Sequence, residues 1–365
     1  MPRKRKDIEV SDLRSSVRGG TSRISANVNG GRLFFESPDI KLRCRPEVFA
    51  SALLPIAVQQ GVCLKLDQAP DRAWRRNVAG ALPVWARWWE TEADLSRVLV
   101  APRSEMRIRP RRAAGTGLCF SLGVDSFHTL LSSERPIDHL ILVQGFDIAL
   151  DDETRMDAAE RSVRAVAERT GTRAVVVRTN LRKGRNGRFP KWRPGNWPRT
   201  HGGALAAIGH ACGREIGELL ISATYFEDVP WGSHWDTDPC FSSSQLAVRH
   251  VGTEERRNDK LAAIVADPLV QDHLRVCYAN QSATGNCCEC QKCVRTMLTI
   301  SVLPGPEKIP AFPSERPFVE LLDAIRKAPM GTIPMYEDLL ARGLEPDIEA
   351  AVNRLLARSP ERMPA

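Results

Sequence analysis

A short stretch of small and hydroxyl-bearing residues has the composition of an anion-binding turn. Its six residues are Ser121, Leu122, Gly123, Val124, Asp125 and Ser126. An apolar run precedes it, and a segment with helical spacing follows it. In such a turn, backbone N–H groups point inward and the helix N-terminus adds its positive dipole. With the two serine hydroxyls as further donors, the turn is predicted to bind phosphate. An ordinary turn in which a serine caps the helix is the alternative.

Asp125 needs a separate explanation, because a carboxylate repels a phosphate beside it. A magnesium ion between the two would remove that repulsion, since Mg²⁺ prefers hard oxygen ligands. The side chain could instead cap the helix. Two other motifs are excluded. No Gly-Lys-Ser/Thr follows Gly123, as a Walker A loop requires, and Cys119 stands where a nucleophile elbow has glycine.

Four of the ten cysteines form a second cluster, at Cys277, Cys287, Cys290 and Cys293. Zinc favours four thiolates in a tetrahedron, with no open position when its role is structural. In a chain without a secretory signal, such clustering indicates metal binding rather than disulfide bonds. Cys288 adjoins Cys287, so we expect its side chain to point away, although the spacing also permits it as a ligand. A redox cluster and an iron–sulfur site are the alternatives.

Alternating strands and helices are expected to position both clusters. The predicted strands span residues 118–121, 139–143, 173–178 and 218–222, and the predicted helices span 125–133, 152–170, 200–214 and 256–266. Repeated units of this kind build an α/β fold with a doubly wound parallel sheet. Ligands bind beyond the carboxyl ends of such strands. The loops expected at that edge are 121–126, 144–150, 178–200 and 222–245.

The flanking segments differ in composition and suggest three domains. Residues 1–112 are predicted to form a small N-terminal α+β domain of unknown role, 113–303 the main domain, and 304–365 a Pro-rich linker with C-terminal helices. In the first unit, an Asn-Gly turn predicts a hairpin of two strands, and the start of the polar segment 1–22 is expected to be poorly ordered. Residues 223–250 are expected to be an irregular loop.

Composition and charge limit the function classes. Hydrophobic residues make up 42% of the 365, yet no run reaches the roughly 18 apolar residues that span a bilayer. No apolar segment follows the charged N-terminus, as a secretory signal requires. We therefore expect a cytoplasmic protein without membrane contact. A net charge of +8 suits either nucleic acid or an anionic nucleotide. The arginines are spread along the chain, so nucleic acid is the weaker expectation.

The two motifs together resemble a known superfamily. Residues 121–126 are similar to the Ser-Gly-Gly-x-Asp-Ser loop of the PP-loop ATP pyrophosphatases, with Leu122 in place of the first glycine. The cysteines resemble the Cys-x8-Cys-Gly-x-Cys-x2-Cys pattern of the 7-cyano-7-deazaguanine synthase (QueC-like) branch, with one extra residue in the first spacer. Cys288 stands where that pattern has glycine, and Arg295 is close to its following arginine. The resemblance covers residues 117–300.

This resemblance implies a fold, ligands and a reaction. The fold would be that of the adenine nucleotide alpha hydrolases, with ATP and Mg²⁺ at the loop and Zn²⁺ at the cysteines. The reaction would adenylate a carboxylate, such as 7-carboxy-7-deazaguanine or a related acid, and release pyrophosphate. Ammonia or an amine would then displace AMP, and the acceptor would be a small molecule or a protein. Such proteins occur in natural-product pathways and in bacterial antiviral defence. We expect a homodimer.

Two further residues are expected to join Asp125 in catalysis. His201 opens a helix at the ligand edge and could meet a phosphate or the adenylated group, although a histidine there can also be a cap or a packing residue. Asp238 lies where the synthases have a Tyr-Pro-Asp substrate loop.

Trp231 and Trp235 could stack on a purine-like ring or only fix the loop. Basic residues that could steer ATP, or simply be solvated, are Arg182, Lys183, Arg185 and Lys191.

Two other function classes stay open. Leu122 motivates a non-catalytic nucleotide sensor or scaffold, because a leucine tolerates positive φ less well than glycine. The positive net charge motivates a factor that modifies nucleic acid.

Overall fold

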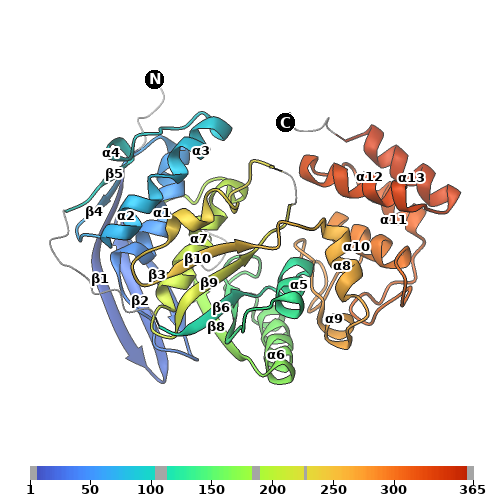
Figure 1. Cartoon of the computed structure of the whole chain (residues 1–365), viewed down its shortest axis with the longest axis horizontal. Coiled ribbons are helices and arrows are strands. Elements are labelled where there is room, and N and C mark those ends of the chain that lie inside the picture. The colour runs from blue at the N-terminus through green and yellow to red at the C-terminus, as the bar shows by residue number, and fades with distance from the viewer. Residues whose placement is uncertain (1–5, 103–112, 183–189, 226–227, 360–365) are drawn as a thin grey trace.

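A single mixed β-sheet runs through the molecule, with helices on both faces (Figure 1). The computed structural model describes residues 6–102, 113–182, 190–225 and 228–359. Among these residues, ten strands form the sheet in the order β10-β9-β6-β7-β8-β3-β2-β1-β4-β5. None of the described helices is both long and apolar enough to cross a membrane. The sequence also predicts a short strand at residues 106–109, and these residues lie outside the described ranges.

Five neighbouring strands at one end of the sheet are parallel to one another. They are β6 (Gly115–Cys119), β7 (His139–Gln144), β8 (Arg173–Thr179), β9 (Ile216–Ser222) and β10 (Ala247–Val251). The chain proceeds outward from β6 through β7 and β8, then returns to place β9 and β10 on the other side of β6. The predicted doubly wound α/β architecture is thus confirmed. The order of strands reverses between β6 and β9, which is where such sheets bind ligands.

Helices bury the two faces of this sheet in two apolar clusters. One face is covered by α1 (Pro46–Gln60) and α7 (Trp197–Ala211), and the other by α5 (Val124–Ser132), α6 (Glu153–Thr170) and α8 (Arg257–Ile264). In β8, Val175 and Val177 face the first cluster while Val176 faces the second, as the alternation of a strand requires. Both faces of these strands are apolar for that reason.

Close packing of α1 against α7 depends on a glycine. A Cβ atom at Gly203 would lie within 2.6 Å of the Pro55 ring and closer still to the carbonyl oxygen of Ser51. Only glycine therefore permits this approach of the two backbones. The first turn of α7, which faces the ligand edge of the sheet, is held firmly as a result.

The N-terminal unit extends the same sheet. Its meander of β1 (Ile8–Arg18), β2 (Thr21–Val28) and β3 (Gly31–Ser37) joins the parallel half where β3 pairs antiparallel with β8. Asn29 and Gly30 both have positive φ, of 50° and 75°, so the predicted hairpin is confirmed.

The remaining elements of the unit complete the sheet and cover its end. They are β4 (Leu64–Leu66), α2 (Arg72–Val78), α3 (Ala81–Trp89), α4 (Leu95–Val98) and β5 (Leu99–Val100). Trp88 of α3 packs edge-on against His234 with ring centroids 4.7 Å apart, and Asn77 of α2 donates a hydrogen bond to the carbonyl oxygen of Ser242. The N-terminal unit thus braces the loop between β9 and β10.

One strand lies where none was predicted, and the prediction of an irregular loop at 223–250 is wrong. Residues 8–18, predicted as part of a polar segment without a strand, form β1, whose buried residues Ile8 and Val10 alternate with exposed polar ones. The predicted irregular loop 223–250 contains most of the edge strand β10 and the short 3-10 helix η2 (Asp238–Phe241). The apolar pattern is weak in both strands, in β1 because one face is polar and in β10 because it lies at the edge of the sheet.

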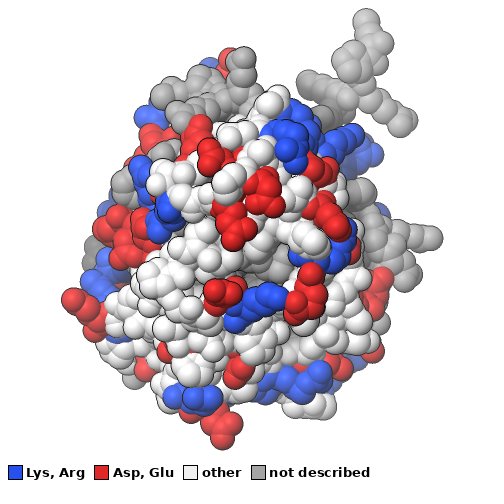
Figure 2. Space-filling model, turned by 90° about the vertical axis from the view of Figure 1, so that its right-hand side faces the viewer, with Lys and Arg blue, Asp and Glu red and all other residues white. Residues whose placement is uncertain are grey.

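The C-terminal part is helical, as predicted. After α8 come α9 (Pro268–His273), α10 (Gln291–Ser301), α11 (Phe318–Ala324), η3 (Met330–Thr332), α12 (Ile333–Arg342) and α13 (Pro346–Ala357). Figure 1 shows these helices as a separate layer beside α5 and α6. On the face shown in Figure 2, Lys and Arg are interspersed with Asp and Glu. Ion pairs connect the C-terminal helices, including Arg354 with Asp323 at 2.7 Å, and lie within them, as for Arg342 with Asp338 at 2.8 Å.

Candidate functional site

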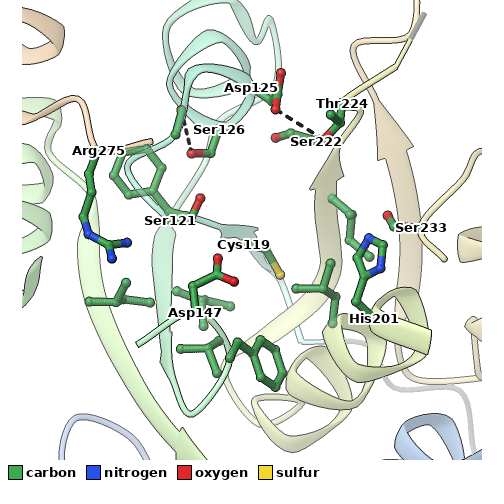
Figure 3. A pocket seen from close by; sticks show the side chains of 18 of the residues that line it. Cys119, Ser121, Asp125, Ser126, Asp147, His201, Ser222, Thr224, Ser233 and Arg275 are labelled. Carbon is green, nitrogen blue, oxygen red and sulfur yellow. Dashed lines mark hydrogen bonds between the residues drawn. The ribbon is translucent and has the colours of Figure 1, made fainter. Parts of the chain in front are cut away.

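A cavity of about 330 Å³ opens at the carboxyl ends of β6, β7 and β9. Its walls come from the loop after β6 (119–126), the end of β7 and its following loop (141–148), the first turns of α7, and the end of β9. Figure 3 shows Ser121, Asp125 and Ser126 at one side of it and His201 with Ser233 at another, with Cys119 between them. The cavity lies at the predicted edge and at the reversal of strand order.

The predicted phosphate loop forms one wall. Gly123 has extended backbone (φ −80°, ψ 164°) and begins α5, and Ser126 Oγ donates to its carbonyl oxygen at 3.0 Å. Ser121, Gly123, Asp125 and Ser126 line the cavity. Because α5 begins here, its free N–H groups and its dipole are available to an anion. Four of the six predicted residues thus face the cavity.

Leu122 and Val124 point into the protein instead. Leu122 has the left-handed conformation (φ 64°) that a glycine would adopt most easily, yet its side chain is 1% exposed and packs in the apolar cluster under α5. Its carbonyl oxygen accepts a hydrogen bond from the Arg275 N–H at 2.8 Å. The leucine therefore keeps the backbone shape of the loop and leaves the cavity clear.

Leu122→Gly is expected to reduce stability and, because this side chain points away from the cavity, to leave the affinity for a ligand bound there unchanged. Removing a buried leucine side chain costs about 2–5 kcal/mol, while relief of the positive φ returns about 1–2 kcal/mol. Urea unfolding should show a net loss in the free energy of unfolding. Calorimetry with ATP and Mg²⁺ should give a Kd within about twofold of the wild type. A marked gain in affinity would show that Leu122 obstructs the site.

Asp125 lies under the loop in a strongly positive environment. Its Oδ2 forms an ion pair with Arg257 and accepts a hydrogen bond from Thr224 Oγ1 at 3.3 Å, while its Oδ1 is buried with no hydrogen-bond partner among the described residues. Burial alone would raise the pKa of Asp125, but Arg257, Lys260 and Lys292 outweigh it and hold the pKa below its ordinary value. The carboxylate is thus ionised, and one of its oxygens has no hydrogen-bond partner among the described residues.

Three cations complete this end of the cavity, and the sequence analysis identified none of them. They are Arg257 from α8, Arg275 from the segment before Cys277, and Lys292 from the first turn of α10. Arg257 Nη2 and Arg275 Nε are buried without a hydrogen-bond partner among the described residues. A buried charged donor without a partner is costly, and an anionic ligand would satisfy it. The cluster indicates a site for a polyanion.

Aromatic rings form the other end. Phe146 and Trp197 lie 4.9 Å apart, and the Arg182 guanidinium lies 4.9 Å from the centroid of the Trp197 ring. Trp231 also lines the cavity, whereas Trp235 packs against His234 outside its walls. A flat ring could lie against such walls. Of the predicted basic residues, Lys191 donates to the Gly30 carbonyl oxygen away from the cavity, and residues 183 and 185 lie outside the described ranges.

The two predicted catalytic residues beyond Asp125 occupy different positions. His201 lines the cavity. Asp238 is fully buried behind the wall and does not line it. Its Oδ2 accepts hydrogen bonds from Ser233 Oγ at 2.6 Å and from His250 Nδ1 at 2.8 Å. Ser233, which does line the cavity, is the group through which Asp238 can influence a ligand.

The four predicted metal ligands meet in one place. The sulfur atoms of Cys277, Cys287, Cys290 and Cys293 all lie within 4.8 Å of one another. Such a set can hold one metal ion. Cys288 is outside the cluster, as predicted. It has φ 58°, and its buried thiol lies 3.7 Å from the Asn286 carbonyl oxygen.

Asn286 fixes the geometry of this cluster. Its Oδ1 accepts hydrogen bonds from the N–H groups of Val276 and Cys277, at 2.8 and 3.1 Å. Its Nδ2 donates to the carbonyl oxygens of Leu274 and Ala311, at 2.8 and 2.9 Å. The segment that carries Arg275 is therefore tied both to the cysteines and, through Leu122, to the phosphate loop.

Comparison with known proteins gives no further assignment. No protein-family model, curated protein or solved structure matches the chain significantly.

Proposed function

We propose that the chain is a PP-loop ATP pyrophosphatase of the 7-cyano-7-deazaguanine synthase type, which adenylates a carboxylate and transfers it to ammonia or an amine. The observation that carries the proposal is the convergence of the phosphate loop, one carboxylate with an unpartnered oxygen and three cations in a single cavity at the reversal of strand order. Such a cavity suits a nucleotide polyphosphate better than a singly charged ligand.

Each wall has a role in this proposal. Backbone N–H groups at the start of α5, with Ser121 and Ser126, would hold phosphate oxygens. Asp125 Oδ1 fits a magnesium ligand, because it is an unpartnered carboxylate oxygen beside the phosphate loop. The ion would neutralise charge on the leaving pyrophosphate. Arg257, Arg275 and Lys292 would stabilise the same charge.

The aromatic end would receive the flat parts of the substrates. Trp197, Phe146 and Trp231 offer ring faces and edges, as a purine-like acid such as 7-carboxy-7-deazaguanine requires. The cysteine cluster would hold a structural zinc ion, since four thiolates leave no open coordination position.

A non-catalytic nucleotide sensor is the second candidate. It is favoured by the ion pair between Asp125 and Arg257, which occupies one oxygen of the expected magnesium ligand. Such a protein would bind ATP and release no AMP.

The test is ATP–pyrophosphate exchange with a panel of carboxylic acids that includes 7-carboxy-7-deazaguanine. We expect one acid to make labelled pyrophosphate enter ATP, because adenylation is reversible. Absence of exchange with every acid, together with ATP binding in calorimetry, would favour the sensor.

A further inference from the structure

His201 presents one ring nitrogen to the cavity while its other nitrogen is already bonded. Nδ1 lies 3.1 Å from the carbonyl oxygen of Trp197, one turn earlier in α7. A carbonyl oxygen only accepts, so in the neutral ring Nδ1 carries the proton and Nε2 keeps its lone pair. Nε2 makes no hydrogen bond to any described residue, and the ring lies in the cavity wall (Figure 3).

The surrounding residues hold the ring in this orientation. It lies between Trp197 and Trp231, with ring centroids 6.0 and 5.5 Å away. Gly232 packs so closely that a Cβ atom there would be 2.8 Å from Nδ1. The Gly202 N–H donates to the Gly232 carbonyl oxygen at 2.9 Å, which fastens this loop to α7. The direction of Nε2 is therefore determined before any ligand binds.

The charges around His201 favour a neutral ring at neutral pH. Burial lowers its pKa, and this outweighs the opposite effects of Asp238, the Trp197 carbonyl and Asp147, while His250 acts in the same direction as burial. Cys119, the nearest thiol in the cavity floor, is not a competing base. Burial, with a smaller effect from Asp238, raises the pKa of this thiol to about 12.

Ser233 offers a second acceptor on the same wall. Its hydroxyl proton is donated to Asp238 Oδ2 at 2.6 Å, so only the oxygen lone pairs remain for the cavity. Two acceptors, one of which is a base, match the two N–H bonds of a primary amine. An alcohol has one O–H and would leave one acceptor unpaired.

We propose that His201 Nε2 is the general base of the second half-reaction and that the nucleophile is ammonia or a primary amine. This inference rests on the proposed adenylation. The amine nitrogen attacks the carbonyl carbon of the acyl adenylate, and a C–N bond forms. The bond from that carbon to the phosphate oxygen breaks, and AMP leaves with the electron pair. The proton of the nitrogen passes to Nε2 and then to water.

The test separates the two half-reactions in a His201→Gln variant, with the acid that supports exchange. ATP–pyrophosphate exchange should stay within about threefold of the wild type. Amide formation from ammonium should fall about 10²–10⁴-fold, the usual contribution of a general base. His273→Gln, on α9 and away from the cavity, is the control and should change neither step.

A second measurement does not depend on turnover. Nitrogen-15 NMR of the histidine rings should show a signal that is absent from His201→Gln. That signal should report a neutral ring protonated on Nδ1, which stays neutral to below pH 6.5. The inference would be overturned if His201→Gln lost exchange and transfer equally, or if it kept full transfer activity. It would also be overturned if the NMR signal showed a ring protonated on Nε2. No exchange in the wild type would instead overturn the proposed function and, with it, this inference.

Discussion

Asp125→Asn is expected to lower acid-dependent ATP–pyrophosphate exchange by roughly 10³-fold, because Asp125 is the proposed anionic magnesium ligand at the leaving group. The same substitution should have opposite effects on ATP binding in the presence and in the absence of Mg²⁺. With Mg²⁺ the variant should bind ATP more weakly than the wild type. With a chelator it should bind at least as tightly, because the wild-type carboxylate then lies unscreened beside the phosphates.

Calorimetry under both conditions checks this reversal. The substitution also leaves Arg257 without its anionic partner, which can cost several kcal/mol in stability. The unfolding temperature must therefore be measured alongside. A binding defect of equal size with and without Mg²⁺ would show that Asp125 is only a structural partner of Arg257.

Cys290→Ser is expected to have the largest effect on stability. Cys290 begins α10, its Sγ lies 3.4 Å from that of Cys293, and its N–H donates to Cys287 Sγ at 3.2 Å. Loss of one thiolate should reduce bound zinc well below one equivalent per chain. The unfolding temperature should fall by about 10 °C, since a structural zinc ion contributes several kcal/mol to a folded domain of this size.

The proposed affinity for nucleotide should fall as well, because Arg275 lies two residues before Cys277, Lys292 lies directly before Cys293, and both line the cavity. Cys288→Ser is the matched control, since that thiol lies outside the cluster. Metal analysis and thermal unfolding of both variants provide the comparison. Retention of zinc by Cys290→Ser, or its loss from Cys288→Ser, would contradict the assigned ligand set.

The sequence predicted those parts of the fold that depend on interactions between residues close together in the chain. The Asn-Gly hairpin, the phosphate loop after an apolar strand and the spacing of the cysteines each depend on a few neighbouring residues. β1 escaped prediction because its exposed face carries the serines and arginines of an irregular segment. β10 escaped because an edge strand needs little apolar surface.

The cations of the site could not be predicted from such patterns. Arg257, Arg275 and Lys292 lie more than 130 residues after Asp125, on three different segments. Only the packing of α8 against α5, and the bond from the Arg275 N–H to Leu122, bring them together. Asp238 is the opposite case, a residue that was predicted for the site but does not line the cavity. Its sequence position suggested contact with a substrate, but it lies behind Ser233 because its loop folds over His250.

The N-terminal unit now has a structural role that its sequence did not indicate. It completes the sheet through β3 and supports the loop that carries Trp231 and Ser233, through Trp88 and Asn77. We therefore expect that it contributes to the shape of the aromatic end of the cavity.

We expect this cavity to cleave ATP between the α and β phosphates. The most direct measurement incubates the protein with ATP labelled in the α-phosphate, Mg²⁺, the acid panel and ammonium, and separates the labelled products. We predict labelled AMP in amounts equal to pyrophosphate, formed only when a suitable acid is present. Labelled ADP with inorganic phosphate, or unchanged ATP with every acid, would contradict the account.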